Sequence, residues 1–409
     1  MAKILRCRSC KNDQIQPFFD LGLQPLANSL LQSPAQPEDS YPLTLVWCSN
    51  CSLVQLNYTV DPKKLFSHYV WVTGTSKTTR DFAEVFAKEV ISRTPSAKEG
   101  FVLDVGSNDG TFLMPFAKQG FNVLGIDPAQ NIVDMANKSG IPTLRRFFGT
   151  RVAKEIKKEH GQAKIVFARN VLPHVANTQD FVQGLAHSLT EDGVLAIEVH
   201  YAGSILKGLQ YDSIYHEHLC YFTLQPLQCL LNDFGLYVFD VLQGPLSGGS
   251  LIVYATKKKK RKSAAYQRLK NTEQQQQLNQ IETWRNFTNK AFTHRNTLRD
   301  ILQKAAKQKL YVAGYGSSAR SSTLLNFCGA NDTLIQTIID QNPLKHGLFT
   351  AGTHIPIDSP ENIMAKNPNF IVLLAWNFAD EIIDILKKKS HYNGRILIPL
   401  PGKPRLLTI

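Results

Sequence analysis

The densest group of ionisable side chains lies between residues 211 and 221, where the sequence is YDSIYHEHLCY. Histidine titrates near neutral pH, and a carboxylate such as that of Glu217 can fix the tautomer of a neighbouring ring, which suits acid–base chemistry. A metal site would need a third ligand beyond His216 and His218, and cysteine at 220 rules out the His-Glu-x-x-His pattern of zinc proteases. A hydrogen-bonded surface loop rich in aromatic residues is an equal alternative on composition alone.

A second stretch, residues 101–113, has the sequence FVLDVGSNDGTFL. An apolar run with β-branched residues, a turn with glycines and an apolar periodic segment predict a strand, a tight loop and the start of a helix. Glycines let a ligand approach the backbone, and the N–H groups at a helix start favour anionic groups. Asp127 ends the next apolar run, where an acidic side chain would reach a ribose hydroxyl.

Two cofactors could use this loop. The dinucleotide pattern G-x-G-x-x-G fits poorly, because Asn108 and Thr111 take the places of its second and third glycines. The pattern Asp-x-Gly-x-Asn-x-Gly instead resembles the first motif of S-adenosylmethionine (SAM) dependent methyltransferases. The residues predicted to bind the cofactor are Asp104, Gly106, Asn108, Gly110, Asp127 and, after the next expected strand, Asn170. An ordinary turn without a ligand is the alternative.

Two Cys-x-x-Cys pairs, Cys7 with Cys10 and Cys48 with Cys51, lie in the N-terminal part of the chain. Each pair can present two thiolates from one turn, and structural zinc takes four thiolates in a tetrahedron. The gap between the pairs is longer than usual, and its prolines predict a loop there. Disulfides are less favoured, because the first residues show no secretory signal.

A second glycine-containing turn, Gly314-Tyr-Gly316-Ser-Ser-Ala319, matches G-x-G-x-x-A, and Asp340 ends the next expected strand. A literal interpretation places NAD here. A weaker one is a helix start that binds phosphate, with Ser317, Ser318 and Arg320 nearby. A turn without a ligand is the third.

Strands and helices alternate around both loops, which predicts an α/β protein with two mostly parallel sheets. Apolar spacing predicts a helix over 82–90 and one long helix, or two, over 278–302. The expected strands are 101–105, 122–126, 165–169, 194–199, an antiparallel pair at 236–241 and 250–256, and then 309–314, 336–340, 370–375 and 395–399.

The 409 residues are too many for one ordinary core and indicate two or three domains. No apolar run is long enough for a membrane helix, so a cytoplasmic protein with no membrane partner is expected. The net charge of +13 suits an anionic partner, although residues 257–262 supply part of it and a lysine-rich background explains it equally well.

Taken together, the whole chain resembles sugar C-methyltransferases that act on nucleotide-linked 4-keto-deoxysugars. The resemblance is carried by the paired cysteines and by the segments FSHYVW, DVGSNDGTFL, ARNVLPHV, YDSIYHEHLCYF, GYGSSAR, DQNPLKHGLFTAGTHIPI and LAWNFADEI. It implies a zinc-binding domain over 1–65, a SAM-dependent methyltransferase domain over 66–256, and a C-terminal Rossmann-like domain over 257–409 that holds no cofactor of its own.

The same resemblance implies catalytic roles for Tyr69, His174, Tyr215, Glu217 and His218. Methylation at carbon needs a carbanion, so the C–H beside a ketone must lose its proton to a base while the enolate oxygen is stabilised. His218 is the predicted base at sugar C3, with Tyr215 and His174 donating toward the C4 oxygen, Glu217 orienting or tuning the local histidines, and Tyr69 seating the sugar. Gly316, Ser318 and Arg320 are predicted to bind the substrate, a thymidine-diphospho-4-keto-6-deoxysugar, with SAM and structural Zn²⁺ as cofactors.

Two departures from the family pattern bear on substrate identity. Trp71 stands where relatives often have a second tyrosine, and Ser321 where they often have glycine. Two other functions compete. A nucleic-acid-binding zinc-ribbon protein is supported by the charge and the cysteines, but residues 1–65 are not especially basic, so no nucleic-acid partner is expected. An NAD-dependent sugar oxidoreductase or epimerase would use Gly314 and Asp340.

Overall fold

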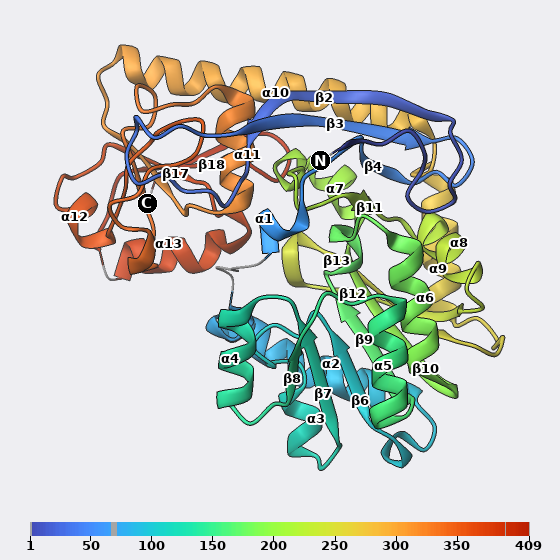
Figure 1. Ribbon diagram of the computed structural model, residues 1–409. Helices are drawn as coiled ribbons and strands as arrows, with labels where there is room; N and C mark the ends of the chain where they lie inside the picture. The colour runs from blue at the N-terminus through green and yellow to red at the C-terminus, as the bar shows by residue number, and fades with distance from the viewer. Residues whose placement is uncertain (1, 67–71, 389, 409) are drawn as a thin grey trace.

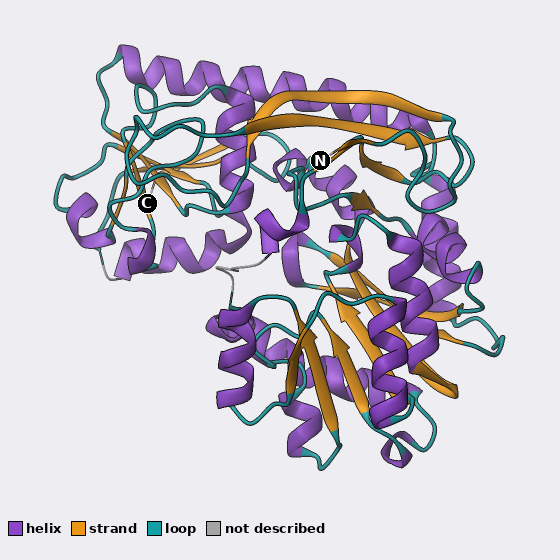
Figure 2. Cartoon of the chain, in the orientation of Figure 1, coloured by secondary structure: helices purple, strands orange, loops and turns teal. Residues whose placement is uncertain are grey.

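A computed structural model of the protein describes residues 2–66, 72–388 and 390–408. Its strands form a seven-stranded, a six-stranded and a four-stranded sheet and a two-stranded ribbon of β1 (Ala2–Lys3) and β5 (Tyr58–Thr59). Figure 2 shows two units in which helices cover a sheet, with long N-terminal strands running along one side of the molecule. The two α/β units confirm the predicted fold class.

The seven-stranded sheet holds the loop around Gly106. Its strand order is β12 (Tyr237–Gly244), β13 (Ser250–Thr256), β10 (Leu189–His200), β9 (Ala163–Arg169), β6 (Val102–Val105), β7 (Val123–Asp127) and β8 (Thr143–Arg145). The pairs from β10 to β8 are parallel, while β13 runs antiparallel to both β10 and β12. The predicted antiparallel pair is confirmed, whereas β8 was missed because three residues give no readable period.

Both faces of this sheet are covered by helices (Figure 1). Alternate residues of β9 point to opposite faces. Phe167 therefore packs on Phe86 of α2, with ring centroids 5.2 Å apart, while Val166 belongs to the core that includes Phe181 of α6. The helices of this unit are α2 (Lys77–Arg93), α3 (Met114–Lys118), α4 (Gln130–Lys138), α5 (Thr150–His160), α6 (Thr178–Ser188), α7 (Ala202–Gly208) and α8 (Leu224–Asn232).

The N-terminal part corrects one expectation. A loop was predicted between the cysteine pairs, but most of that gap forms two long antiparallel strands, β2 (Ile15–Pro25) and β3 (Ser40–Cys48), with register shifts. These shifts break the strict alternation that would have marked strands in the sequence. The sheet continues through β4 (Val54–Leu56) to β11 (Cys220–Tyr221), which lies far away in the sequence, and α1 (Pro62–Phe66) follows β5.

The six-stranded sheet belongs to the C-terminal unit. Its order is β16 (Ile357–Asp358), β15 (Thr337–Ile339), β14 (Val312–Tyr315), β17 (Phe370–Leu373), β18 (Arg395–Ile398) and β19 (Arg405–Thr408), parallel except for β19. The helices are α9 (Ala264–Gln275), α10 (Ile281–Lys307), α11 (Ala319–Cys328), α12 (Pro360–Met364) and α13 (Ala379–Lys388). The apolar stripe over 278–302, for which one long helix or two were expected, lies in the single helix α10 from Ile281 onward, and Leu278 lies in the turn before it.

Helix α10 runs beside β2 (Figure 1), and its stripe is core. Trp284 packs on Phe18 and Phe287 on Phe19, with ring centroids 5.9 and 6.1 Å apart. Among the described helices, none combines the length and the apolar character needed to cross a membrane. Short 3-10 turns occur at Thr73–Thr75, Ala97–Glu99, Leu172–His174, Tyr211–Ser213, Leu246–Gly248, Pro343–Lys345 and Trp376–Phe378.

Candidate active site

The backbone of the loop after β6 has a conformation that lets a ligand approach closely. Gly106 and Gly110 have φ of +78° and +79°, and a Cβ on Gly106 would lie 2.1 Å from Cγ2 of Val171. Asp127, at the end of β7, accepts the backbone N–H of Asn108 at 3.0 Å through Oδ2 and that of Ala129 at 2.9 Å through Oδ1. The carboxylate therefore holds the loop, and each of its oxygens keeps a second lone pair for a ligand.

Asp104 lies deeper than the other predicted cofactor residues. It is 2% exposed, and burial raises its pKa well above the ordinary value, although the charge of Arg169 opposes this. Arg169 is itself buried and pairs with Glu198 at 2.5 Å. Asn170 follows at the carboxyl end of β9 with φ +52°, and its N–H donates to the Glu198 carbonyl at 2.8 Å. Asp104 thus supports the loop from within the sheet, while Asn170 lies at the sheet edge where ligands bind.

A segment that leads into α2 crosses the same loop. The backbone N–H of Thr73 donates to Oδ1 of Asn108, and that of Gly74 donates to Oδ2 of Asp109, both at 2.9 Å. The predicted sugar-seating residue Tyr69, and Trp71 beside it, lie outside the described residues. The chain from the N-terminal part therefore reaches the methyltransferase unit directly over the predicted cofactor loop.

The histidine-rich stretch brings three of the predicted catalytic residues together. Nδ1 of His218 lies 2.7 Å from the carbonyl oxygen of Ser213, and Nε2 lies 2.8 Å from the hydroxyl of Tyr215. Because a carbonyl only accepts, Nδ1 carries the proton and the lone pair of Nε2 faces the phenol. The ring of His174 is 5.0 Å from that of His218 between centroids.

Both rings are neutral at neutral pH. Burial lowers the pKa of His174 to about 4. Burial, with contributions from the neighbouring rings of His174 and His200, also lowers the pKa of His218 well below its ordinary value. A neutral imidazole with a free lone pair is the form that accepts a proton.

Glu217 has a different environment from the one expected. Burial raises its pKa to about 7, and its Oε1 accepts the side-chain amide of Asn28 at 2.5 Å. The neighbouring rings are instead held by backbone carbonyls, His218 by that of Ser213 and His216 by that of Tyr41 at 3.3 Å. The tautomers of these histidines are therefore set by main-chain oxygens.

The C-terminal unit meets this region through Arg320. Its Nη2 donates to Oε1 of Gln210 at 2.9 Å and lies 3.3 Å from Nε2 of His200. Trp376 donates its indole N–H to the buried carboxylate of Asp212 at 2.7 Å. The residues of this unit thus touch the segment just before Tyr215.

The other two predicted substrate residues shape the turn before α11. Gly316 has φ +97°, and its N–H donates to the Ile339 carbonyl at 2.8 Å. Ser318 caps the helix, forming a reciprocal capping box with Ser321. The serine at 321, a departure from the family pattern, is therefore used to close this turn.

The four paired cysteines form one cluster. Their sulfur atoms all lie within 4.8 Å of one another, and the Cys7–Cys51 and Cys10–Cys48 separations are both 3.6 Å. A tetrahedral zinc with bonds of about 2.3 Å needs sulfurs roughly 3.8 Å apart. Lys11 and Ser52, each following a pair, have φ of +59° and +63° and donate back to Cys7 and Cys48. The two turns are thus equivalent, and the donor set fits zinc.

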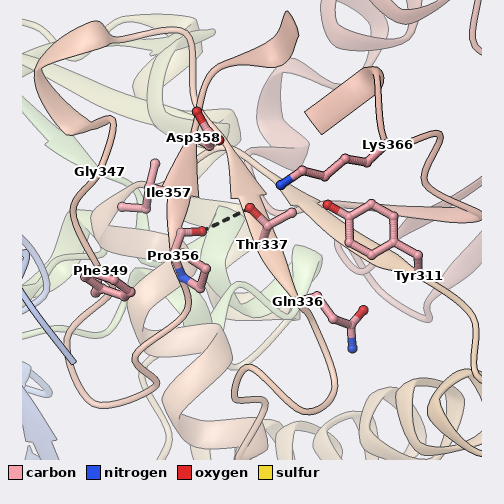
Figure 3. Close-up of a pocket in the computed structure, with 9 residues that line it drawn as sticks. All are labelled: Tyr311, Gln336, Thr337, Gly347, Phe349, Pro356, Ile357, Asp358 and Lys366. Carbon is pink, nitrogen blue, oxygen red and sulfur yellow. Dashed lines mark hydrogen bonds between the residues drawn. The ribbon is translucent and has the colours of Figure 1, made fainter. Parts of the chain in front are cut away.

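A pocket in the C-terminal unit lies elsewhere. Its volume is about 400 Å³. Figure 3 shows the side chains that line it, which include Tyr311, Gln336 and Lys366. Tyr311 and Gln336 come just before β14 and β15, so the pocket opens at the amino ends of these parallel strands. Ligands of open α/β sheets bind at the carboxyl ends. The predicted catalytic histidines therefore remain the candidate site, and this pocket is not.

Several residues of this site were not anticipated. Gln210 and Asp212 precede the histidines, Trp376 comes from the C-terminal unit, and Asn28 comes from the N-terminal part. Asp212 and Trp376 lie in segments that carried the family resemblance, which was a usable signal. Asn28 had no such signal, because its partner lies 189 residues away.

These features define an α/β methyltransferase with a four-cysteine N-terminal domain. Family models agree: a putative zinc binding domain matches residues 7–66, a methyltransferase domain 79–241, and a C-methyltransferase C-terminal domain 245–401. The chain is 32% identical to C-methyltransferase NovU from Streptomyces niveus over 98% of its own length and 96% of that protein. The protein therefore belongs to the C-methyltransferase family.

Other similarities are restricted to part of the chain. The human mitochondrial ubiquinone biosynthesis O-methyltransferase is 30% identical over 36% of this chain and 45% of its own length. Magnesium protoporphyrin IX methyltransferase from Synechocystis PCC 6803, solved with bound SAH, covers 44% of this chain and 83% of its own at 14% identity and a TM-score of 0.35.

These comparisons and the cysteine cluster confirm the predicted family, the enzyme class, and the cofactors SAM and zinc. The roles of individual residues remain predictions.

Proposed function

We propose that the protein transfers a methyl group from SAM to C3 of a thymidine-diphospho-4-keto-6-deoxysugar through an enolate, in the synthesis of a branched deoxysugar. The observation that carries the proposal is the pair formed by Tyr215 and His218, whose hydroxyl and Nε2 lie 2.8 Å apart. O- and N-methylation use an existing lone pair and need no such pair, whereas C-methylation needs a base and an enolate stabiliser side by side.

The spacing of this pair suits adjacent positions of one sugar. When the phenol of Tyr215 turns to the C4 oxygen, the lone pair of Nε2 on His218 becomes free for the neighbouring C3 proton. The electron pair of the C3–H bond then becomes the enolate, and Tyr215 stabilises its oxygen by hydrogen bonding. Ser213 holds the Nδ1 proton, so the ring charges without rotating.

The other predicted residues surround this pair. His174, with its ring 5.0 Å from that of His218, is placed to donate toward the same oxygen. Tyr69 is proposed to seat the sugar. Arg320, together with the turn of Gly316 and Ser318, is proposed to face the diphosphate, for which a guanidinium is well suited.

When bound, SAM would supply an electrophilic methyl group: C3 would form the new C–C bond with the electron pair of the enolate, and S-adenosylhomocysteine would leave with the electrons of the S–CH3 bond. The loop with Gly106, Asn108 and Gly110 holds the cofactor close to the backbone, and Asp127 is proposed to accept from its ribose. Asn170, at the carboxyl end of β9, is proposed to complete the site beside Asp104. Orientation by these residues supplies much of the rate, because in-line transfer depends on alignment.

The test is hydrogen exchange at sugar C3 in D₂O, with thymidine-diphospho-4-keto-6-deoxyglucose and no SAM, followed by mass spectrometry and NMR. We expect deuterium at C3, loss of that exchange in His218→Ala, and a C-methyl product once SAM is added. His160→Ala, which changes an exposed histidine at the end of α5, is the matched control and should exchange normally. Methylation without any dependence on His218 would refute the assignment of the base, and the absence of both exchange and product would refute the substrate.

A further inference from the structure

The N-terminal part of the chain also holds the loop that carries the predicted catalytic residues. After His216, which bonds to the Tyr41 carbonyl, the Leu219 carbonyl accepts the backbone N–H of Leu56 at 2.9 Å. Strand β11 then pairs with β4 as the outer strand of the N-terminal sheet. The catalytic loop is therefore a component of this sheet, although it follows the methyltransferase core in sequence.

The side chain of Asn28 adds a polar contact to this arrangement. Its amide donates to Oε1 of Glu217 at 2.5 Å, across 189 residues of sequence. Glu217 is only 5% exposed, whereas Asn28 itself is exposed, so the amide lies between a buried carboxyl group and solvent. A buried carboxylate needs such a donor, because leaving a buried charged group without a hydrogen-bond partner is destabilising.

The segment bearing Asn28 is itself fixed from two sides. The backbones of Leu31 and Phe349 exchange two hydrogen bonds of 2.8 Å, which joins the segment to the C-terminal unit. Glu38 pairs with His354 of the same unit at 2.8 Å. Because β2 and β3 anchor its ends, the segment between them is a defined wall rather than a free loop.

We propose that Asn28 of the zinc-binding domain is a positioning residue of the active site, whose amide holds the Glu217 carboxylate on the loop that carries Tyr215 and His218. This inference rests on the proposed function. It gives the N-terminal domain a part in the active site, through Glu217, beyond that of a folded support.

The electrostatics of Glu217 show what the contact does. Burial raises the pKa of Glu217 to about 7, and the Asn28 hydrogen bond opposes that rise. The charge on Glu217 also contributes to raising the pKa of Tyr215, the titratable neighbour on the same loop, where burial is the larger cause. From the facing N-terminal segment Asn28 contributes a neutral amide, and the rings of His216 and His218 are held by carbonyls. Loss of the amide should therefore raise the pKa of Glu217 further and leave it protonated near neutral pH.

The first measurement needs no substrate. Carboxyl infrared difference titration, with Glu217→Gln subtracted to isolate the group, gives its pKa in the whole zinc-loaded protein. Asn28→Ala should raise that pKa by roughly one unit, the size expected for a lost charge-assisted hydrogen bond. Asn28→Asp should raise it more, since two carboxyl groups would share one proton. Ser29→Ala, at the neighbouring exposed position, should change nothing.

The second measurement separates positioning from folding. With thymidine-diphospho-4-keto-6-deoxyglucose, Asn28→Ala should lower kcat about tenfold at pH 7 and recover toward the wild-type rate at higher pH. Zinc content and the Kd for SAM should match the wild type. A reduced kcat that higher pH does not restore, or an unchanged pKa of Glu217, would overturn the inference. If the wild type gives no product, the proposed function fails, while the infrared titration still decides the role of Asn28.

Discussion

The two Rossmann-like units build their first loops in the same way. In the methyltransferase unit, Asp127 accepts the N–H of Asn108 in the loop and that of Ala129 two residues later. In the C-terminal unit, Asp340 accepts the N–H of Ser317 at 2.8 Å and that of Asn342 at 2.9 Å. In each case an acidic residue at the end of the second strand ties down the turn after the first.

The difference lies in what else reaches the acid. Lys345 places its ammonium 3.0 Å from Oδ2 of Asp340 and 2.5 Å from the Ser317 carbonyl. Among the ion pairs of the described residues, Asp127 takes part in none, and burial raises its pKa. The Asp340 oxygen that accepts the Ser317 N–H also accepts from Lys345, so Asp340 keeps fewer free acceptor positions for a ribose hydroxyl than Asp127 does. The loop that better matches the dinucleotide pattern is thus the less suited to a nucleoside, which argues against the NAD-dependent alternative.

The largest effect that separates the two loops should come from filling their glycines. Gly106→Ala puts a Cβ 2.1 Å from Val171 at φ +78°, and Gly316→Ala puts one 2.5 Å from Cβ of Ala375 at φ +97°. Both changes strain the backbone, but only the first lies in the proposed cofactor loop. By titration calorimetry, Gly106→Ala should weaken SAM binding on the order of 100-fold. Gly316→Ala should leave the affinity for SAM within about twofold of the wild-type value.

Thermal unfolding of the same two variants provides the control. Similar decreases in Tm with different SAM affinities would show that the two loops differ in SAM binding and that the difference does not come from a loss of stability. Equal losses of SAM affinity would show that the two loops act as one site, and the comparison would fail.

An intermediate effect is expected from the two acids. Asp127→Asn keeps the shape of the side chain but turns one acceptor into a donor that faces a backbone N–H. We expect SAM affinity to fall about tenfold, as for one lost charge-assisted hydrogen bond and a repelled donor. Asp340→Asn should leave SAM affinity unchanged. Calorimetry with SAM measures both, and fluorescence titration with NADH should give no binding for the wild type or for either variant.

The sequence predicted most of what depends on local pattern. The glycines of the loops after β6 and β14 predicted tight turns, and these glycines have positive φ. The spacing of the two cysteine pairs predicted the four-cysteine cluster that they form. Family resemblance supplied the order of the three units. It also assigned Tyr215 and His218 to one catalytic site. Composition alone had left an ordinary surface loop as an equal alternative for this stretch.

What the sequence could not give depends on contacts between distant segments. The pairing of β11 with β4 brings residues 220–221 to residues 54–55, and a strand of two residues has no period to read. The loop expected between the cysteine pairs became β2 and β3, because register shifts obscure their alternation. The environment of Glu217 follows from that assembly, since Asn28 reaches it only when the N-terminal sheet is complete.

The smallest effect concerns Lys345, the residue that distinguishes the two acids. Its side chain is 23% exposed and that of Asp340 is 11% exposed, so the pair is partly screened by solvent. Lys345→Met should lower the free energy of unfolding by about 1 kcal/mol and leave SAM affinity unchanged. The matched control is Lys388→Met, which breaks the exposed Lys388–Asp384 pair of 2.8 Å and should leave stability close to that of the wild type. Chemical denaturation of both variants measures these values. A loss of stability in Lys345→Met no larger than in the control would mean that Asp340 does not depend on the lysine, and that the shape of the turn alone separates the C-terminal loop from the cofactor loop.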